Sequence, residues 1–357
     1  MILNRRATTT RLGLVALIGI SLALSGCGST AASPSDILPG GSGATDAPQD
    51  TPSDIDTNPP ATTMPVLGPV VPTVAPGQSG TVLAWGDDTG GQVDVPDGLS
   101  GVVAVSAGDE FSLALKSDGT VVAWGADDAG QTDIPAGLAN VKAISAGSSF
   151  AVALKSDGSL VGWGDNSDGQ LKPPSGLTGL SKIAAGGNHV LGLKADGTVA
   201  AWGSDAGGEI DVPAGLSDVV AISAGYDFSM AVKKDGTIVA WGNKFPTDGA
   251  PSTVAIPAGL SGMVGISAGY FHALAVRSDG TVVGWGTNDS GQTITPVGLK
   301  ALAVAAGGNF SIALKPDGTL AAWGGSESGQ TSIPGSPTNV VAIAAGGSHC
   351  LAIVASK

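Results

Sequence analysis

The fold is decided by residues 141–164, which read VKAISAGSSFAVALKSDGSLVGWG. The second and third apolar runs of this stretch are joined by Ser156-Asp157-Gly158, and an Asp-Gly pair favours the backbone angles of a tight hairpin. A glycine-rich loop then leads to a fourth short strand, predicted near Gln170. One unit is therefore expected to form four antiparallel strands. The first three are the apolar runs at residues 141–146, 150–155 and 159–163, which have the composition of β-strands.

The same unit recurs from residue 81 to the end of the chain. The seven tryptophans mark it, at positions 85, 124, 163, 202, 241, 285 and 323, mostly 39 residues apart. A period near 40 residues with several short strands and no helical pattern is typical of a β-propeller, not of a helical solenoid. The sequence therefore predicts an all-β domain over residues 81–357: a seven-bladed β-propeller with four-stranded blades.

The hairpins predict how the ring closes. Asp-Gly hairpins occur six times, at Gly119, Gly158, Gly197, Gly236, Gly280 and Gly318. The seventh is missing where the domain begins and ends. We therefore expect a composite blade in which residues 340–345 and 349–354 are the inner strands, and residues 81–85 and the segment near Gln92 are the outer strands. This two-plus-two closure would tie the termini together, since each blade otherwise contacts only its neighbours.

Three kinds of segment carry a resemblance to a known family: Val141 to Gly147, Phe271 to Gly280, and Thr281 to Gly286 followed by Gly291-Gln292. They are similar to the regulator-of-chromosome-condensation repeat, and the resemblance covers residues 81–354. It implies a seven-bladed propeller, in agreement with the count of tryptophans. The short, uniform repeats also resemble the propeller-type β-lactamase inhibitory proteins of actinomycetes. That likeness lies in the scaffold, which does not fix function.

The N-terminus has the pattern of a bacterial export signal. Three arginines precede an apolar run from Leu12 to Leu24, which is shorter than the roughly 20 residues that cross a bilayer. Such a run fits the apolar region of a signal peptide. It ends in Leu24-Ser25-Gly26-Cys27, which resembles the lipobox of bacterial lipoproteins. The resemblance implies a signal peptide over residues 1–26 and lipidation of Cys27; an ordinary cleaved signal with a coincidental cysteine is the alternative.

Residues 27–80 are predicted to be a linker. The segment after Cys27 is rich in Pro, Ser, Thr, Gly, Ala and Asp and contains no aromatic residue. It cannot bury enough apolar surface to offset the entropy lost on ordering. We therefore expect a disordered tether with a reach of roughly 40 Å. It would hold the domain off the bacterial cell membrane or outer membrane to which lipidated Cys27 anchors it.

Charge and cysteine content narrow the function. Without the three arginines of the signal, 13 of the 16 basic residues remain against 30 acidic ones. Such an excess of negative charge argues against nucleic-acid binding. If Cys27 is acylated, Cys350 has no disulfide partner, so the stability of the exported domain must come from packing.

No pattern of catalytic or cofactor-binding residues stands out. His189, His272 and His349 follow a repeat glycine by three residues, in a slot that holds phenylalanine in the four other repeats. We interpret this slot as a packing position. The loop starting at Asp165 begins like a calcium loop, but Gly176 stands where an EF-hand needs glutamate. No phosphate-binding or dinucleotide-binding motif is present. We expect no metal site, no cofactor and no enzymatic activity.

The loops of the predicted propeller divide into two faces of different charge. The Asp-Gly hairpins should open on one face, where lysine or arginine accompanies the aspartates. The loops after each first strand and after each Trp-Gly should open on the other, which we call the acidic face, and where Lys244 is the one basic residue. Its acidic residues are Asp87, Asp88, Asp109, Glu110, Asp127, Asp128, Asp165, Asp168, Asp205, Asp227, Asp248, Asp289 and Glu327.

Aromatic residues outside the repeat pattern map to the same acidic face. One of them lies on the single long loop, residues 243–253. Aromatic anchors among polar loops have the composition of an interaction hot spot; local packing of the inserted loop is the alternative. The predicted binding site comprises Tyr226, Asp227, Phe245, Asp248, Tyr270 and Phe271.

The sequence therefore favours a monomeric, non-catalytic protein-binding module whose partner carries a basic patch and which touches the membrane only through its lipid. A narrower alternative, implied by the scaffold resemblance alone, is an inhibitor of a β-lactamase or penicillin-binding protein. The competing class is an enzyme, a hydrolase or lyase acting at the mouth of the channel.

Overall fold

The computed structural model describes residues 79–242 and 255–355. The chain divides into two units, residues 1–59 and 60–357, and every described residue belongs to the second. All regular structure in the described ranges is β-strand, which confirms the all-β prediction. These ranges contain no helix that is long and apolar enough to cross a membrane. The predicted signal peptide, Cys27, the linker up to residue 78, Phe245 and Asp248 lie outside the described residues.

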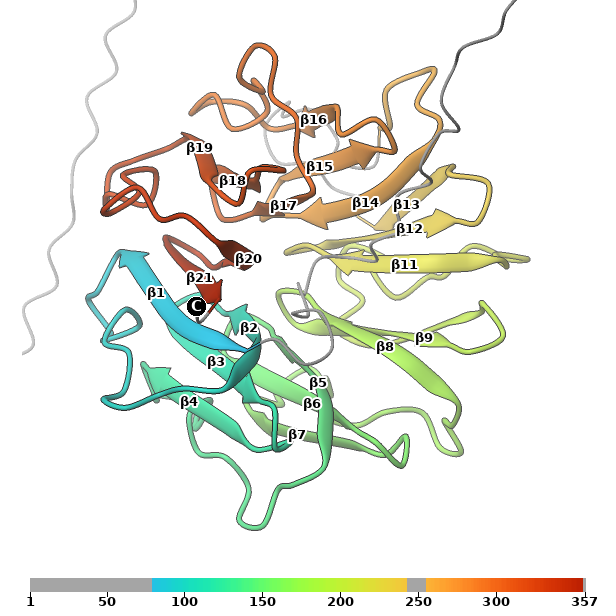
Figure 1. Cartoon of the computed structure of the whole chain (residues 1–357). Helices are drawn as coiled ribbons and strands as arrows, with labels where there is room; N and C mark the ends of the chain where they lie inside the picture. The colour runs from blue at the N-terminus through green and yellow to red at the C-terminus, as the bar shows by residue number, and fades with distance from the viewer. Residues whose placement is uncertain (1–78, 243–254, 356–357) are drawn as a thin grey trace, which may run out of the picture. The chain divides into compact units, whose positions relative to one another are not determined.

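The strands follow one another in antiparallel sets of three that are arranged around a centre (Figure 1). Most sets form a separate sheet; β2-β3-β4 and β20-β21-β1 share one six-stranded sheet. The bounds of the consecutive sets are β2 Val102–Ala107, β3 Phe111–Lys116, β4 Val121–Gly125; β5 Val141–Ala146, β6 Phe150–Lys155, β7 Leu160–Gly164; β8 Leu180–Ala185, β9 His189–Lys194, β10 Val199–Gly203; β11 Val219–Ala224, β12 Phe228–Lys233, β13 Ile238–Gly242; β14 Met263–Ala268, β15 His272–Arg277, β16 Val282–Gly286; and β17 Ala303–Ala306, β18 Phe310–Leu314, β19 Leu320–Gly324.

The Asp-Gly hairpins join the second and third strands of these sets, as predicted. At Gly158 the backbone φ is 86°, a left-handed conformation that glycine adopts without a steric penalty. The preceding Asp157 accepts a hydrogen bond from the Ser159 amide at 2.9 Å. The carboxylate therefore fixes the turn, and the glycine lets the chain reverse.

The sets contain three strands where the sequence predicted four. Residues around Gln170, the expected fourth strand, form turns. The side-chain oxygen of Gln170 accepts from the Asp168 amide at 3.0 Å, and its side-chain nitrogen donates to Asp165 at 2.7 Å. Its backbone carbonyl accepts from the Trp202 indole of the next set at 2.9 Å. These bonds curl the segment and join neighbouring sets, so the glutamine acts as a turn organiser and not as a strand residue.

The domain closes on a composite set built from both ends of the described chain. Strand β1 (Gly80–Gly86) pairs along its whole length with β21 (His349–Ala355), which pairs in turn with β20 (Val340–Ala345). Trp85 donates to the Gln330 carbonyl at 2.9 Å, the same bond that joins other neighbouring sets. The two inner strands from the C-terminus and the outer strand β1 pair as expected, but the segment near Gln92 is a turn, so this set has two strands from the C-terminus and one from the N-terminal side, not the predicted two.

The core lies between neighbouring sets. One apolar cluster, for example, joins Phe228 and Met230 of β12 to Ile266, Ala273 and Trp285 of the next set. The first strands contact one another in succession, and β20 contacts β2, so they enclose a central channel. The propeller interior is thus a series of packed seams around this channel, and the loops at its two ends are free to vary.

Candidate functional site

Two sets of loops come together at one end of the channel, as predicted for the acidic face. In the described ranges, the loop after a third strand is bonded to the loop between the first two strands of the same set. Examples are the Ala126 amide to the Glu110 carbonyl at 2.9 Å and the Thr287 amide to the Phe271 carbonyl at 2.8 Å. The hairpin face differs from the acidic face in charge balance, because basic side chains there pair with the hairpin aspartates. For example, Lys116 lies 3.3 Å from Asp118. Every ion pair between described residues includes a hairpin aspartate.

The residue after each repeat glycine forms the rim of the channel mouth. Backbone bonds join successive rim positions, among them the Asp109 amide to the Ser148 carbonyl at 3.1 Å and the Ser148 amide to the Gly187 carbonyl at 3.2 Å. The Gly347 amide closes the rim by donating to the Gly108 carbonyl at 3.1 Å. The rim residues are Asp109, Ser148, Gly187, Tyr226, Tyr270, Gly308 and Gly347.

Tyr270 lies along this rim and is not the freely exposed anchor that the sequence predicted. Its hydroxyl donates to the carboxylate of Asp109 at 2.5 Å, across the rim glycines Gly308 and Gly347. A side chain at Gly347 would place its Cβ 2.7 Å from the Tyr270 hydroxyl, so the glycine leaves room for the tyrosine. Burial raises the pKa of Asp109, against the lowering effect of its bonds to Tyr270 and Ser148. Tyr270 therefore belongs to the support of the site.

Tyr226 and Phe271 supply the exposed part of the aromatic cluster. They are 38% and 41% exposed, respectively. The Tyr226 ring centroid lies 5.2 Å from that of Tyr270 and 5.8 Å from that of Phe271, within the range of favourable aromatic pairs. The structure thus brings together three of the predicted aromatic residues, of which Tyr270 holds the other two in place.

Asp227 borders this cluster next to an acidic residue that the sequence analysis did not single out. Burial raises the pKa of Asp227, and the nearby carboxylate of Glu209 adds to the effect. Glu209 is buried and occupies the slot that holds glutamine in the equivalent described turns, with its carboxylate accepting from the Gly207 amide at 2.6 Å. The signal was available in the sequence, since Glu209 departs from the glutamine of Gln170 and its counterparts.

A groove runs beside the cluster, and sequence reasoning did not predict it. It has a volume of about 490 Å³ and is lined by Tyr270, Phe271, Asp289, Asn309 and Glu327, among others. These residues come from loops of three successive strand sets. The alignment of distant loops creates it, so no single repeat carries its signature.

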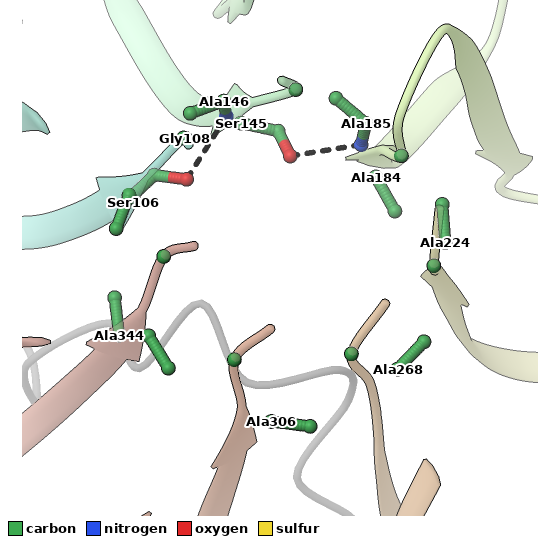
Figure 2. A pocket seen from close by; sticks show the side chains of 18 of the residues that line it. Ser106, Gly108, Ser145, Ala146, Ala184, Ala185, Ala224, Ala268, Ala306 and Ala344 are labelled. Atoms are coloured by element: carbon green, nitrogen blue, oxygen red, sulfur yellow. Dashed lines mark hydrogen bonds between the residues drawn. The ribbon is translucent and has the colours of Figure 1, made fainter. Parts of the chain in front are cut away.

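The channel itself is narrow, and Asp109 at the rim is the one charged residue among its described lining residues. Its volume is about 140 Å³, and small residues of the first strands line it. Figure 2 shows the hydroxyl oxygens of Ser106 and Ser145 accepting hydrogen bonds from the amides of Ala146 and Ala185, both at 2.9 Å. These hydroxyls link neighbouring inner strands. An activated nucleophile needs a base in contact with its hydroxyl, and these two hydroxyls instead contact backbone amides.

The histidines lie in the seams between strand sets, away from the channel. His272 contacts the Ser311 hydroxyl at 3.0 Å, and Ser311 gives its proton to the Gln292 carbonyl at 2.9 Å. The imidazole must therefore be the donor, which places its proton on Nε2. Burial lowers the pKa of His272 to about 4, so the ring is neutral near pH 7. His189–Ser229 and His349–Ser112 repeat this arrangement. The packing interpretation is confirmed, with a serine partner that it missed.

Cys350 is a buried free thiol whose sulfur lies 3.4 Å from the Gln330 carbonyl. Burial raises its pKa well above the usual value. Among the described residues, no group of three or more His, Cys, Asp or Glu side chains is arranged to hold a metal ion.

Comparison with known proteins agrees with this architecture. The model of the regulator of chromosome condensation (RCC1) repeat matches residues 102–131, 141–170, 180–209, 219–244, 263–292 and 302–330. Comparison with curated proteins gave no significant match.

Solved structures of similar fold include Prp20p of Saccharomyces cerevisiae, with a TM-score of 0.65 and 19% identity over 78% of this chain and 92% of that one. Human WBSCR16 has a TM-score of 0.60 and 15% identity over 78% and 98%. The ectodomain of the receptor kinase CR4 from Physcomitrella patens has a TM-score of 0.56 and 21% identity over 68% of each chain. Six matched repeats on a fold shared with these proteins show that the chain belongs to the regulator of chromosome condensation (RCC1) repeat family.

Proposed function

We propose that this chain is a seven-bladed propeller that binds another protein through its acidic face and carries out no reaction there. Seven tryptophans, one for each set of three strands, support the blade number. The binding role is in keeping with the yeast relative, whose structure is described together with its binding to Gsp1p and histones. The one charged residue among the described lining residues of the channel, Asp109, is bonded to Tyr270, and the histidines lie in the seams, so neither supports a hydrolase or lyase.

One observation carries the proposal: two aromatic side chains, those of Tyr226 and Phe271, are exposed at the surface. Tyr226 and Phe271 present apolar rings on a face rich in carboxylates, and Tyr270 fixes them from below through its bond to Asp109. Rigid, partly exposed aromatics surrounded by polar groups are characteristic of interaction hot spots. The surrounding carboxylates would steer a partner that carries a basic patch.

The proposal also includes the tether. Lipidation of Cys27 and residues 28–80 would display the domain at a bacterial membrane, with the acidic face available to partners in the envelope. Detergent phase separation of the chain from its host tests this part, because an anchored chain enters the detergent phase and an unanchored one stays in the aqueous phase.

Capture of a partner from envelope extracts by the full-length chain, followed by affinity measurement, tests the binding role. We expect Tyr226→Ala to weaken binding by about 1–3 kcal/mol, or about 5- to 150-fold, because it removes an exposed ring from the cluster. The melting temperature should stay close to that of the parent. The matched control is Lys155→Ala on the hairpin face, which should change neither quantity. A Tyr226→Ala chain that binds the captured partner as tightly as the parent would overturn the assignment.

A further inference from the structure

The groove beside the aromatic cluster has the dimensions of a binding site. Its volume of about 490 Å³ falls within the roughly 300–1,000 Å³ of pockets that enclose small ligands. It is open along the acidic face and runs from the β14–β15 loop to the β20–β21 loop. Such a shape admits several side chains of an extended segment and not only one.

The groove combines two aromatic side chains, Tyr270 and Phe271, with two carboxylates. Phe271 stands exposed at its side, while Asp289 and Glu327 come from the loops that follow β16 and β19. The remaining lining residues are neutral, and no lysine, arginine or histidine is among them. A ligand in this groove therefore meets negative charge and an aromatic ring together.

These carboxylates are poorly compensated within the described part of the chain. Glu327 accepts a long hydrogen bond, 3.5 Å, from the Asn309 side-chain amide. Neither Glu327 nor Asp289 forms an ion pair with a described residue. A carboxylate two positions earlier in the turn is used internally instead, as where Asp165 accepts from the Gln170 side chain at 2.7 Å. The groove acids thus retain acceptor capacity for an incoming cation.

We infer that this groove binds an extended, arginine-bearing segment of the partner protein; this inference rests on the proposed function. A guanidinium is planar and always charged. It can donate two parallel hydrogen bonds to a carboxylate while its face stacks on an aromatic ring. Asp289, Glu327 and Phe271 offer both kinds of contact in one groove. Lysine would satisfy the charge but would lack the planar stacking.

Fluorescence anisotropy with the full-length chain tests the inference. The probe is a fluorescein-labelled Gly-Ser-Arg-Gly-Arg-Ser-Gly peptide at low ionic strength, compared with peptides in which lysine or neutral citrulline replaces arginine. We expect the arginine peptide to bind most tightly. Asp289→Asn combined with Glu327→Gln should weaken it about tenfold or more, since both charge-assisted bonds are lost. Phe271→Ala should weaken it about threefold.

The matched control is Asp128→Asn, compared with Asp289→Asn alone: each removes one carboxylate charge on the same face, the first outside the groove and the second within it. Asp128→Asn should alter affinity less than about twofold. Equal affinity for the citrulline or lysine peptide would overturn the arginine assignment. Equal weakening by Asp128→Asn and by the groove variants would show only diffuse attraction and would overturn the site. If the peptide results contradict the inference while Tyr226→Ala still weakens binding of the captured partner, the groove assignment is wrong and the proposed binding face stands. If no partner is captured, the proposed function is wrong.

Discussion

The seams between blades and the rim of the channel mouth both vary from repeat to repeat, but in different ways. At each seam, the slot three residues after the repeat glycine holds histidine or phenylalanine, and a residue of the next blade faces it. Histidine always meets serine. Phenylalanine meets a residue without a hydroxyl: Phe111 packs with Ala151, Phe150 with Val190, Phe228 with Ala273 and Phe310 with Cys350. Variation at the seam is matched by the neighbour.

Variation at the rim is matched only in part. Gly308 and Gly347 leave room for the Tyr270 ring, and Tyr270 is bonded to Asp109, so these four rim residues form one interacting group. Tyr226 and Phe271, which follows the rim, remain exposed, and no comparable hydrogen bond joins either side chain to another described residue. Residue changes that a neighbour compensates belong to packing, whereas uncompensated aromatic residues point to a role outside the fold. This contrast is the strongest support for placing the binding site at Tyr226 and Phe271.

The largest effect is expected when a histidine at a seam loses its serine partner. Ser311→Ala removes the acceptor of His272 Nε2–H and leaves a buried donor without a partner, at a cost of about 1–3 kcal/mol in the free energy of unfolding. Adding His272→Phe should recover much of this loss, because the double variant then has the Phe–Ala composition of the Phe228–Ala273 seam. Urea denaturation of the single and double variants measures both values.

His272→Phe alone is the control for this pair. Ser311 would keep its bond to the Gln292 carbonyl, so this variant should lose less stability than Ser311→Ala. A double variant as unstable as the sum of the two single variants would show that the pair is not coupled, and the seam would then be no different from the uncompensated rim.

The repeat made the fold readable from sequence, because each tryptophan, hairpin and inner strand is specified again in every unit. Position 170 shows the limit of that reading. A glutamine between glycine and an apolar residue fits a short strand, yet its amide organises a turn and its carbonyl serves the tryptophan of the next blade. The first bond lies within the turn, but the second crosses to the next unit, so the pattern of one unit does not reveal it.

The site was predictable where composition departs from the repeat, as at Tyr226 and Phe271. It was not predictable where the partner lies far along the chain. Tyr270 stands out in the sequence as an exposed aromatic, and only the ring closure brings it to Asp109, 161 residues away. The serine partners of the histidines, by contrast, could have been found by aligning each repeat with the next, since Ser229 and Ser311 appear one unit after His189 and His272.

A smaller effect is expected at the matched part of the rim. Tyr270→Phe removes the hydroxyl that donates to Asp109 and should cost about 1–2 kcal/mol at pH 7. The pKa of Asp109 in the folded protein is raised above its usual value of 3.8 by burial, so its contribution is fully present below that pH and is lost as pH rises through the raised pKa. Because the Tyr270 bond lowers this pKa, the variant should lose more stability than the parent between pH 4 and pH 7.

Unfolding in urea at the two pH values measures the difference, and Asp109→Asn should abolish it. Equal losses in parent and variant would place Tyr270 with the uncompensated aromatics.

The smallest effect is expected on the hairpin face, where every unit repeats the same turn. The pKa of Asp118 is lowered to about 2, chiefly by the Thr120 hydroxyl and then by the Thr120 amide and Lys116. The pKa of Asp279 is also lowered to about 2, first by the Thr281 amide and then by the Thr281 hydroxyl and Lys300. For a lowered pKa the sign is opposite to that of Asp109: the stabilising contribution is present above the usual value of 3.8 and is lost as pH falls toward 2.

Asp118→Asn with Asp279→Asn keeps the side-chain oxygens that accept from the threonine amides but removes the charges. The melting temperature at pH 7 should therefore fall slightly, by the amount that the two charges contribute, while its decline from pH 4 to pH 2, followed by circular dichroism, should become shallower. The captured partner should bind as before, because these residues lie on the hairpin face. A double variant with the parent's acid profile would show that these carboxylates do not couple folding to pH, and one that weakens partner binding would move part of the site away from the acidic face.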